Sequence, residues 1–145
     1  MKFLFREVPI NTKNHVELID VTDDVETFLR ECEIKQGICG IYLPHSTAAI
    51  VMNEHEKGLM RDIISAVERL CTNEDGWLHD RINTNASAYL ASTILGSSRT
   101  FPIKDGRLIR GRWQNIFLLE LDGPRPRTML IQIIGEERTE LTNFK

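Results

Sequence analysis

Hydrophobic and polar residues alternate along the chain with two different periods, which separate predicted strands from predicted helices. Alternation at residues 3–5, carried by Phe3 and Phe5, predicts a half-buried first strand, and residues 16–21 predict a second. Thr22 then fits a helix N-cap, before apolar residues at helical spacing. Residues 47–52 are apolar on both faces, as expected of a central strand.

The second half of the chain begins with the clearest amphipathic pattern, which predicts a helix over residues 59–70. A polar, irregular stretch at 71–83 follows. A shorter helix is predicted at 86–95, with Gly96 as its C-terminal cap. Asp105-Gly106 is typical of a tight hairpin turn.

Long apolar runs at 113–121 and 128–134 predict two strands joined by a turn, and 38–43 predicts another strand. Many strands and about three helices without regular alternation predict an α+β fold, a largely antiparallel sheet or sandwich. The chain has 145 residues, so we expect one domain over 1–145.

The composition narrows the class of protein. Hydrophobic residues make up 41% and charged residues 27%, the balance of a soluble globular protein. Apolar stretches are too short for a membrane span, and the N-terminus is charged too early for a secretory signal. Three cysteines, Cys32, Cys39 and Cys71, cannot all pair within one chain, so we expect reduced thiols and a cytoplasmic protein.

The net charge of −3 argues against a nucleic-acid partner, but the charge is unevenly distributed. Residues 99–127 hold seven basic and three acidic groups, and this segment is therefore +4. A positive segment in an acidic chain suits a small anionic ligand better than a polymer. A solvated, arginine-rich hairpin is an equally good interpretation.

Two segments that contain histidine are candidates for metal binding or proton transfer. His45 lies in a turn between two predicted strands, where an imidazole could bind a metal or move a proton, although a lone histidine is more often structural. At the other end of the same strand, Asn53-Glu54-His55 could bind a metal, but acidic residues there are more simply explained as helix capping.

Two further segments complete the candidates. His79-Asp80 lies in the long polar loop, and His45 and His79 with a carboxylate could hold zinc, although no fixed zinc-site spacing is present. Ser97, Arg107 and Arg112 belong to glycine-, serine- and arginine-rich segments that could bind an oxyanion.

With these residues in view, the sequence resembles the YjbQ-like family, also called UPF0047 and labelled secondary thiamine-phosphate synthase. The resemblance covers residues 40–136 and is carried by the following segments: HSTAAIVMNE at 45–54, HD at 79–80, LGSS at 95–98, GRL at 106–108, GRWQ at 111–114, Glu120, GPR at 123–125 and QIIGE at 132–136.

The resemblance implies a compact α+β homotrimer, with a cleft that contains histidines and sometimes a metal ion. It also implies weak thiamine-phosphate synthesis, in which hydroxymethylpyrimidine diphosphate is joined to thiazole phosphate and pyrophosphate is released. The chain departs from the family pattern at Tyr89, where a histidine is usual, and at Arg112 and Asn115, where small residues are usual. Ser46-Thr47 also reverses the usual Thr-Ser order. These changes make the expected site less suited to a metal and more positive.

Three functions are compatible with these residues. The first is a transferase acting on phosphorylated thiamine precursors, with His45, His79 and Glu54 as catalytic candidates. The second is a metal-dependent hydrolase, in which the same three residues hold zinc or magnesium. The third is a non-enzymatic trimer that binds a phosphorylated metabolite. The expected ligand-binding residues are Ser46, Thr47, Asn53, Ser97, Arg107, Arg112, Trp113 and Gln114.

Overall fold

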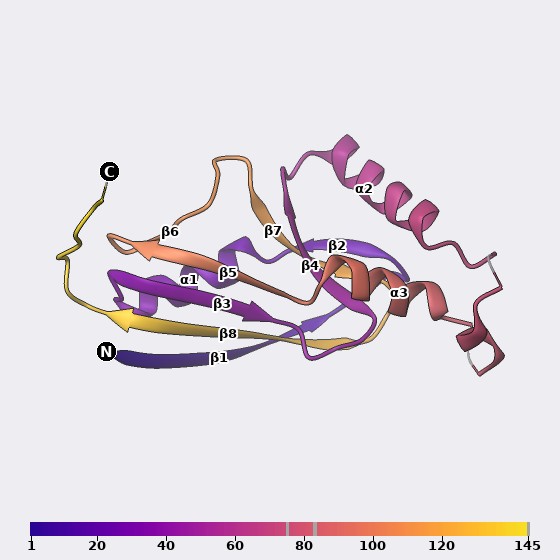
Figure 1. The fold of residues 1–145 in the computed structure, drawn as a ribbon, viewed down its shortest axis with the longest axis horizontal. Coiled ribbons are helices and arrows are strands. Elements are labelled where there is room, and N and C mark those ends of the chain that lie inside the picture. Colours follow the sequence, from indigo (N-terminus) through magenta and orange to yellow (C-terminus); the bar gives the residue numbers. More distant parts are fainter. Residues whose placement is uncertain (75, 83, 145) are drawn as a thin grey trace.

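The computed structural model describes residues 1–74, 76–82 and 84–144. Within these residues the chain forms three α-helices, one 3-10 helix and eight strands (Figure 1). Their order and bounds are β1 Lys2–Asn11, β2 Glu17–Asp20, α1 Thr22–Cys32, β3 Gln36–Tyr42, β4 Ala48–Asn53, α2 Lys57–Leu70, η1 Leu78–Arg81, α3 Ala86–Leu95, β5 Ser98–Lys104, β6 Arg107–Leu108, β7 Asn115–Glu120 and β8 Pro126–Glu136. No helix in this described part is long and apolar enough to cross a bilayer.

The strands form two sheets, and every pair of neighbouring strands within each sheet is antiparallel. The larger sheet has the order β1-β8-β3-β5-β6, and the smaller has the order β2-β7-β4. This arrangement confirms the predicted α+β class with a largely antiparallel sandwich.

The two sheets enclose the main core, and the helices extend it. Alternate residues of β7 divide between two clusters, since Ile116 and Leu118 pack toward the larger sheet and α1 while Leu119 packs toward α3. Helices α2 and α3 therefore lie on the outer side of the smaller sheet (Figure 1). Strand β7 is buried on both faces because a layer covers each of them.

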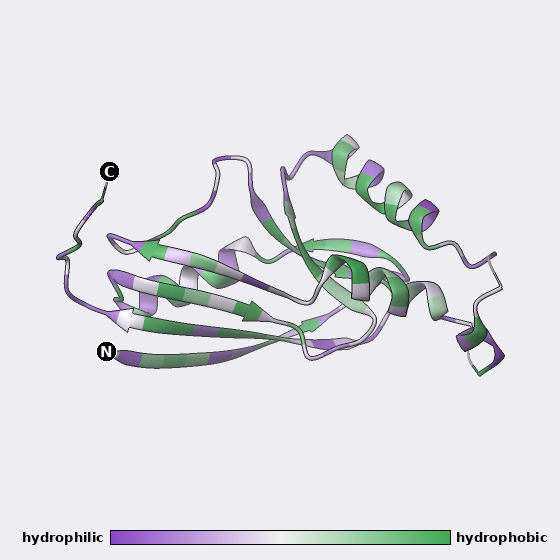
Figure 2. Ribbon diagram, in the orientation of Figure 1, coloured by the Kyte–Doolittle hydropathy of each residue, from purple (hydrophilic) through white to green (hydrophobic). Residues whose placement is uncertain are grey.

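The larger sheet buries only one face, as the alternating burial along β8 shows. Figure 2 shows that apolar residues are frequent along its strands. Residues Met129, Ile131 and Ile133 of β8 are fully buried, while the residues between them are not. The predicted first strand is confirmed, but Phe3 and Phe5 lie on its outer face and are 70% and 55% exposed. Leu4, Val8 and Ile10 of β1 pack on the core instead.

Several local predictions were wrong in detail. Residues 48–53 form an edge strand of the smaller sheet, where β7 is central. Strand β4 is buried because α3 packs against it, with the Ser92 hydroxyl donating to the Ala48 carbonyl at 2.8 Å. Thr22 is the first residue of α1, and the Asp20 carboxylate accepts from its backbone N–H. Trp113 precedes β7 and is exposed.

The remaining elements follow the predicted pattern. Helix α3 has the predicted bounds, and Gly96 follows it with a φ of 89°. Asp105 and Gly106 both adopt positive φ between β5 and β6, as the tight hairpin turn requires.

Strands β3 and β8 approach closely at Gly37, which pairs with Gly135. A Cβ at Gly37 would lie 2.1 Å from the Ile134 carbonyl oxygen, whereas one at Gly40 of the same strand would meet its nearest atom at 3.9 Å. Only the first position therefore needs the absence of a side chain for steric reasons.

We expect Gly37→Ala to lower the free energy of unfolding by about 1–3 kcal/mol, because the backbone must shift to admit the methyl group. Gly40→Ala is the matched control and should cost distinctly less. Chemical denaturation measures both, and equal losses for the two variants would contradict the packing described for β3 and β8.

Candidate functional site

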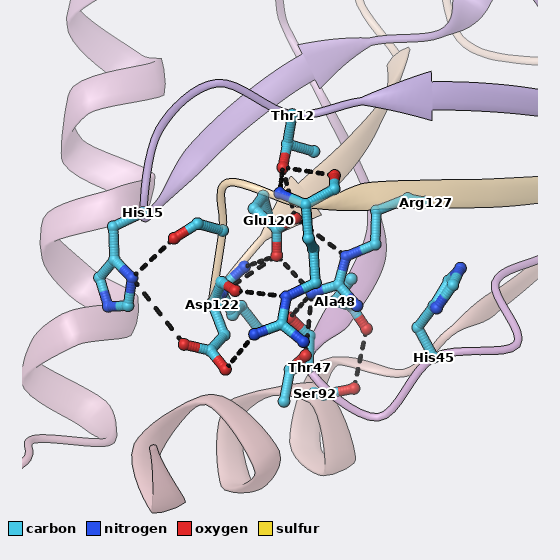
Figure 3. A network of polar contacts seen from close by, with 12 residues as sticks. Thr12, His15, His45, Thr47, Ala48, Ser92, Glu120, Asp122 and Arg127 are labelled. Atoms are coloured by element: carbon cyan, nitrogen blue, oxygen red, sulfur yellow. Dashed lines mark hydrogen bonds and ion pairs between the residues drawn. The ribbon is translucent and has the colours of Figure 1, made fainter. Parts of the chain in front are cut away.

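A buried ion pair joins the two sheets at the end of β7. The Glu120 side chain is fully buried, and Arg127 of β8 is 4% exposed. The Arg127 guanidinium donates through Nε and Nη2 to the two carboxylate oxygens of Glu120, with an Nε–Oε1 distance of 2.9 Å. Because Glu120 belongs to the smaller sheet and Arg127 to the larger, this pair links the sheets (Figure 3).

Further hydrogen bonds complete the coordination of Glu120. The Thr12 hydroxyl donates to Oε1 at 2.8 Å, and the backbone N–H groups of Leu121 and Asp122 donate to Oε2 at 3.0 Å. Burial alone would raise the pKa of Glu120, but the hydrogen bonds from Arg127, Asp122 and Thr12 outweigh it and lower that pKa. The carboxylate is therefore charged and fully occupied as an acceptor, which identifies it as a positioning group.

The same network fixes the turn that carries His45. Arg127 Nη2 donates to both the carbonyl and the hydroxyl oxygen of Thr47, each at 2.9 Å. His45 lies at the edge of the network (Figure 3), and its Nε2 accepts the backbone N–H of Thr128 at 2.9 Å. Burial lowers the pKa of His45, and the positive charge of Arg127 lowers it further. The ring is therefore neutral at pH 7, with its proton on Nδ1, which can donate to a ligand oxygen.

A separate cavity of about 560 Å³ lies between α1, the β5–β6 turn and the loop before β7. Its charged lining residues are Glu26, Arg30, Lys35, Asp105, Arg107, Arg110 and Arg112. The acidic residues in it are already engaged, Glu26 by Arg110 at 2.9 Å and Asp105 by the side-chain amide of Gln36. Within the described chain Arg107 and Arg112 form no ion pair, so their charges are available to an anion.

The loop 109–114 has a fixed shape that presents Arg112. Gln114 accepts the Gly111 N–H on its side-chain oxygen at 2.6 Å, and its own backbone N–H donates to the Gly111 carbonyl. The Arg112 guanidinium lies 5.2 Å from the centroid of the exposed Trp113 ring. Gln114 therefore supports the loop, and the exposed Trp113 ring lies beside Arg112.

The structure places the candidates expected from the sequence in two groups at opposite ends of β4. His45, Ser46 and Thr47 precede the strand, and Ser97 joins them because its carbonyl accepts the Leu43 N–H.

The second group follows the strand. Asn53 pairs with Asn115, which adjoins the loop that carries Arg112, and Glu54 comes next in the chain. A strand rises by about 3.3 Å per residue, so the two ends lie about 20 Å apart. One small molecule cannot touch both groups within a single chain.

His79 belongs to neither group. It lies on η1 beside α3, with its ring centroid 4.7 Å from that of Tyr89, and its buried Nε2 has no hydrogen-bond partner among the described residues. Figure 1 shows η1 and the β6–β7 loop far apart in the molecule. In one chain, therefore, the imidazoles and Arg112 do not share a hollow.

The described residues do not fit the metal ion that the resemblance implies. No group of three or more His, Cys, Asp or Glu side chains among them could hold an ion. His45 Nε2 is already occupied by Thr128, and residue 89 next to His79 is a tyrosine.

Sequence reasoning missed the pair Glu120–Arg127 as the centre of the network. The available signal was a single carboxylate within the otherwise apolar run 116–121. The positive segment 99–127 is not one patch either, because Arg127 is buried with Glu120 and Arg125 pairs with Asp122, whereas Arg107, Arg110 and Arg112 line the cavity.

The fold and the two polar ends of β4 define a class of small α+β proteins with a two-sheet sandwich. The chain belongs to the YjbQ-like UPF0047 family, whose model matches residues 6–136. It is 42% identical to a UPF0047 protein of Archaeoglobus fulgidus, over 88% of this chain and 99% of that protein.

Solved structures agree with this assignment. A YbjQ-like protein of unknown function from Sulfolobus solfataricus matches with a TM-score of 0.91 and 48% identity, over 93% of this chain and 99% of that one. A YjbQ/UPF0047 family protein from Clostridium acetobutylicum matches with a TM-score of 0.84 and 31% identity, over 89% and 99% of the two chains.

We expect Glu120→Gln to lower the free energy of unfolding by about 3–5 kcal/mol, since it leaves the Arg127 charge buried without a counter-charge. Glu136→Gln removes a carboxylate from an exposed pair with Arg138 and is the control, expected to stay close to wild type. Chemical denaturation at pH 7 measures both.

The pH dependence of the free energy of unfolding supplies a second test of the role of Glu120. Because the pKa of Glu120 is lowered from its ordinary value of 4.5, its contribution is complete above that value and is lost as the pH falls through the folded-state pKa. Glu120→Gln should therefore flatten the loss of stability on acidification. An unchanged acid profile would contradict the role given to this carboxylate.

Proposed function

We propose that the chain binds a small phosphorylated metabolite in the cavity lined by Arg107 and Arg112. The observation that carries the proposal is the set of unpaired guanidinium groups around a cavity of about 560 Å³ whose acidic residues are already engaged. Guanidinium groups bind phosphate oxygens in pairs and remain charged at every physiological pH.

We further propose that the activity is the one implied by the family resemblance, thiamine-phosphate synthesis. In that reaction the thiazole nitrogen bonds to the methylene carbon of the pyrimidine, and the bond from that carbon to the pyrophosphate oxygen breaks. Arg107 and Arg112 would stabilise the negative charge that develops on the departing pyrophosphate. Holding the two substrates side by side would supply the remaining acceleration.

The place of His45 in this proposal depends on a second copy of the chain. The Nδ1–H of its neutral ring suits hydrogen-bond donation to a phosphate oxygen. His45, however, lies at the opposite end of β4 from the arginines. We propose that the chain is a homotrimer in which one copy brings its His45 end near the cavity of another. The exposed Phe3, Phe5, Ile38 and Tyr42 on the outer face of the larger sheet favour self-association.

Binding can be tested with inorganic pyrophosphate by isothermal titration calorimetry. We expect Arg107→Ala and Arg112→Ala each to weaken binding by about tenfold or more, the value of one charge-assisted hydrogen bond. Arg69→Ala, in the last turn of α2, is the control and should leave affinity unchanged. Affinity should fall as ionic strength rises. Equal affinity for all of these variants and wild type would refute the cavity as the anion site.

Turnover requires a separate assay. Purified chain with hydroxymethylpyrimidine diphosphate, thiazole phosphate and Mg²⁺ should yield thiamine phosphate and pyrophosphate in equal amounts, and Arg112→Ala should reduce the yield. If pyrophosphate binds but no thiamine phosphate forms, the transferase is rejected and the chain is a metabolite-binding protein.

A further inference from the structure

A second polar cluster lies between β2, the segment after β4 and the start of β7. The imidazole Nδ1 of His55 is 2.6 Å from Oδ2 of Asp20. The Asp20 carboxylate is itself fixed by the Thr22 hydroxyl at 2.6 Å, the Thr22 backbone N–H at 2.9 Å and the Asn115 amide at 2.7 Å. Asp20 and His55 therefore form a dyad in which the carboxylate is held rigidly before it meets the ring.

The charge on Asp20 determines the proton position on His55. Burial would raise the pKa of Asp20, but the hydrogen bonds from His55, Thr22 and Asn115 outweigh burial and lower the pKa to about 2. An ionised carboxylate only accepts hydrogen bonds, so His55 Nδ1 carries a proton. In the neutral ring the lone pair is then on Nε2, which bonds to no described side chain or backbone group. The ring also packs against Phe117 with centroids 5.5 Å apart, which limits its rotation.

His55 lies at the rim of a cavity of about 480 Å³ between β2 and α2. Val16, Leu18, Met60 and Ile64 form its apolar part, and none of these is fully buried. The charged groups around it are Glu17, Lys57 and Arg61. Lys57 and Arg61 stand one helical turn apart on α2 and present two cations to the same space.

The Glu17 carboxylate is turned to its own loop, where it accepts the backbone N–H of Lys13 at 2.6 Å and the side-chain amide of Asn14 at 2.9 Å. The space beside His55 therefore combines an oriented base, two available cations and an apolar wall. That combination suits a small ester with an aliphatic chain, because the carbonyl oxygen of an ester becomes negatively charged during hydrolysis.

We propose that Asp20 and His55 form a general-base site that hydrolyses small aliphatic esters in the cavity between β2 and α2. His55 Nε2 takes a proton from water as the water oxygen bonds to the ester carbonyl carbon. The resulting oxyanion lies near Lys57 and Arg61. As it collapses, the bond to the alcohol oxygen breaks, and the proton on Nε2 passes to that oxygen. His55 is the catalytic residue and Asp20 a positioning residue. This site is separate from the arginine cavity and does not depend on the function proposed there.

The test uses p-nitrophenyl butanoate with the full-length chain, and thermal unfolding confirms that each variant is folded. His55→Gln should lower kcat by about 10²-fold or more, the usual contribution of a general base. Asp20→Asn presents an amide N–H to the ring, which reverses the tautomer and should lower kcat while KM stays the same. Asp20→Glu should restore part of the lost rate. His15→Gln removes an exposed imidazole elsewhere and is the matched control, expected to match wild type.

The rate should also be lower in D₂O, because a proton moves in the rate-limiting step. The proposal is overturned if wild type is no faster than the same concentration of free imidazole, or if His55→Gln and His15→Gln reduce the rate equally. A folded Asp20→Asn variant with wild-type kcat would leave Asp20 without the assigned role and would equally overturn the dyad.

Discussion

Two opposite charges buried between the sheets, Glu120 and Arg127, constrain the geometry of this end of the molecule. Removing either charge from water is costly, and the loss is offset only when both partners and a full set of hydrogen bonds are present. The structure meets that condition with Thr12, Thr47 and two backbone N–H groups. A slip of β7 by one residue would turn the carboxylate away from Arg127, so the pair specifies the alignment of the two sheets as well as stabilising it.

The buried pair also explains how the polar residues before β4 are held in place. The Arg127 guanidinium reaches the Thr47 backbone, and the adjacent Thr128 N–H holds His45, so one buried network orders the turn before β4. At the other end of β4 the Asp20 carboxylate is held by Thr22, Asn115 and His55 but is only partly buried, and the loop with Arg112 is shaped by Gln114. The end of β4 that follows His45 and the end that lies next to the loop with Arg112 are separated by the length of the strand, which is why the proposed reaction needs two copies of the chain.

The smaller sheet supports a different arrangement on its other side. Helix α2 is amphipathic, yet Val67 is its only fully buried residue among those described. A cavity that is partly open to solvent lies between the first turns of α2 and β2, beside His55. The Asp20 carboxylate accepts hydrogen bonds from the start of α1 and from the ring of His55, so it connects a helix terminus to the proposed reaction centre.

Elements whose signals are local could be predicted from the amino-acid sequence. The helical period of apolar residues located α2, and a long apolar run located β8. Gly96 marked the end of α3, and Asp105-Gly106 gave the tight turn, because each signal depends on neighbours within a few residues. The segments between residues 45 and 136, taken together, likewise carried the resemblance to the family.

Which candidate residues lie in contact with one another depends on the packing of the two sheets and the helices. The apolar residues at 47–52 suggested a central strand, but β4 is an edge strand buried by α3, and sequence periodicity cannot tell a neighbouring strand from a covering helix. The partnership of Glu120 with Arg127, the separation of His45 from Arg112, and the contact of Asp20 with His55 all depend on how sheets and helices stack. Their physical reason is long-range packing, which brings together residues that no local pattern relates.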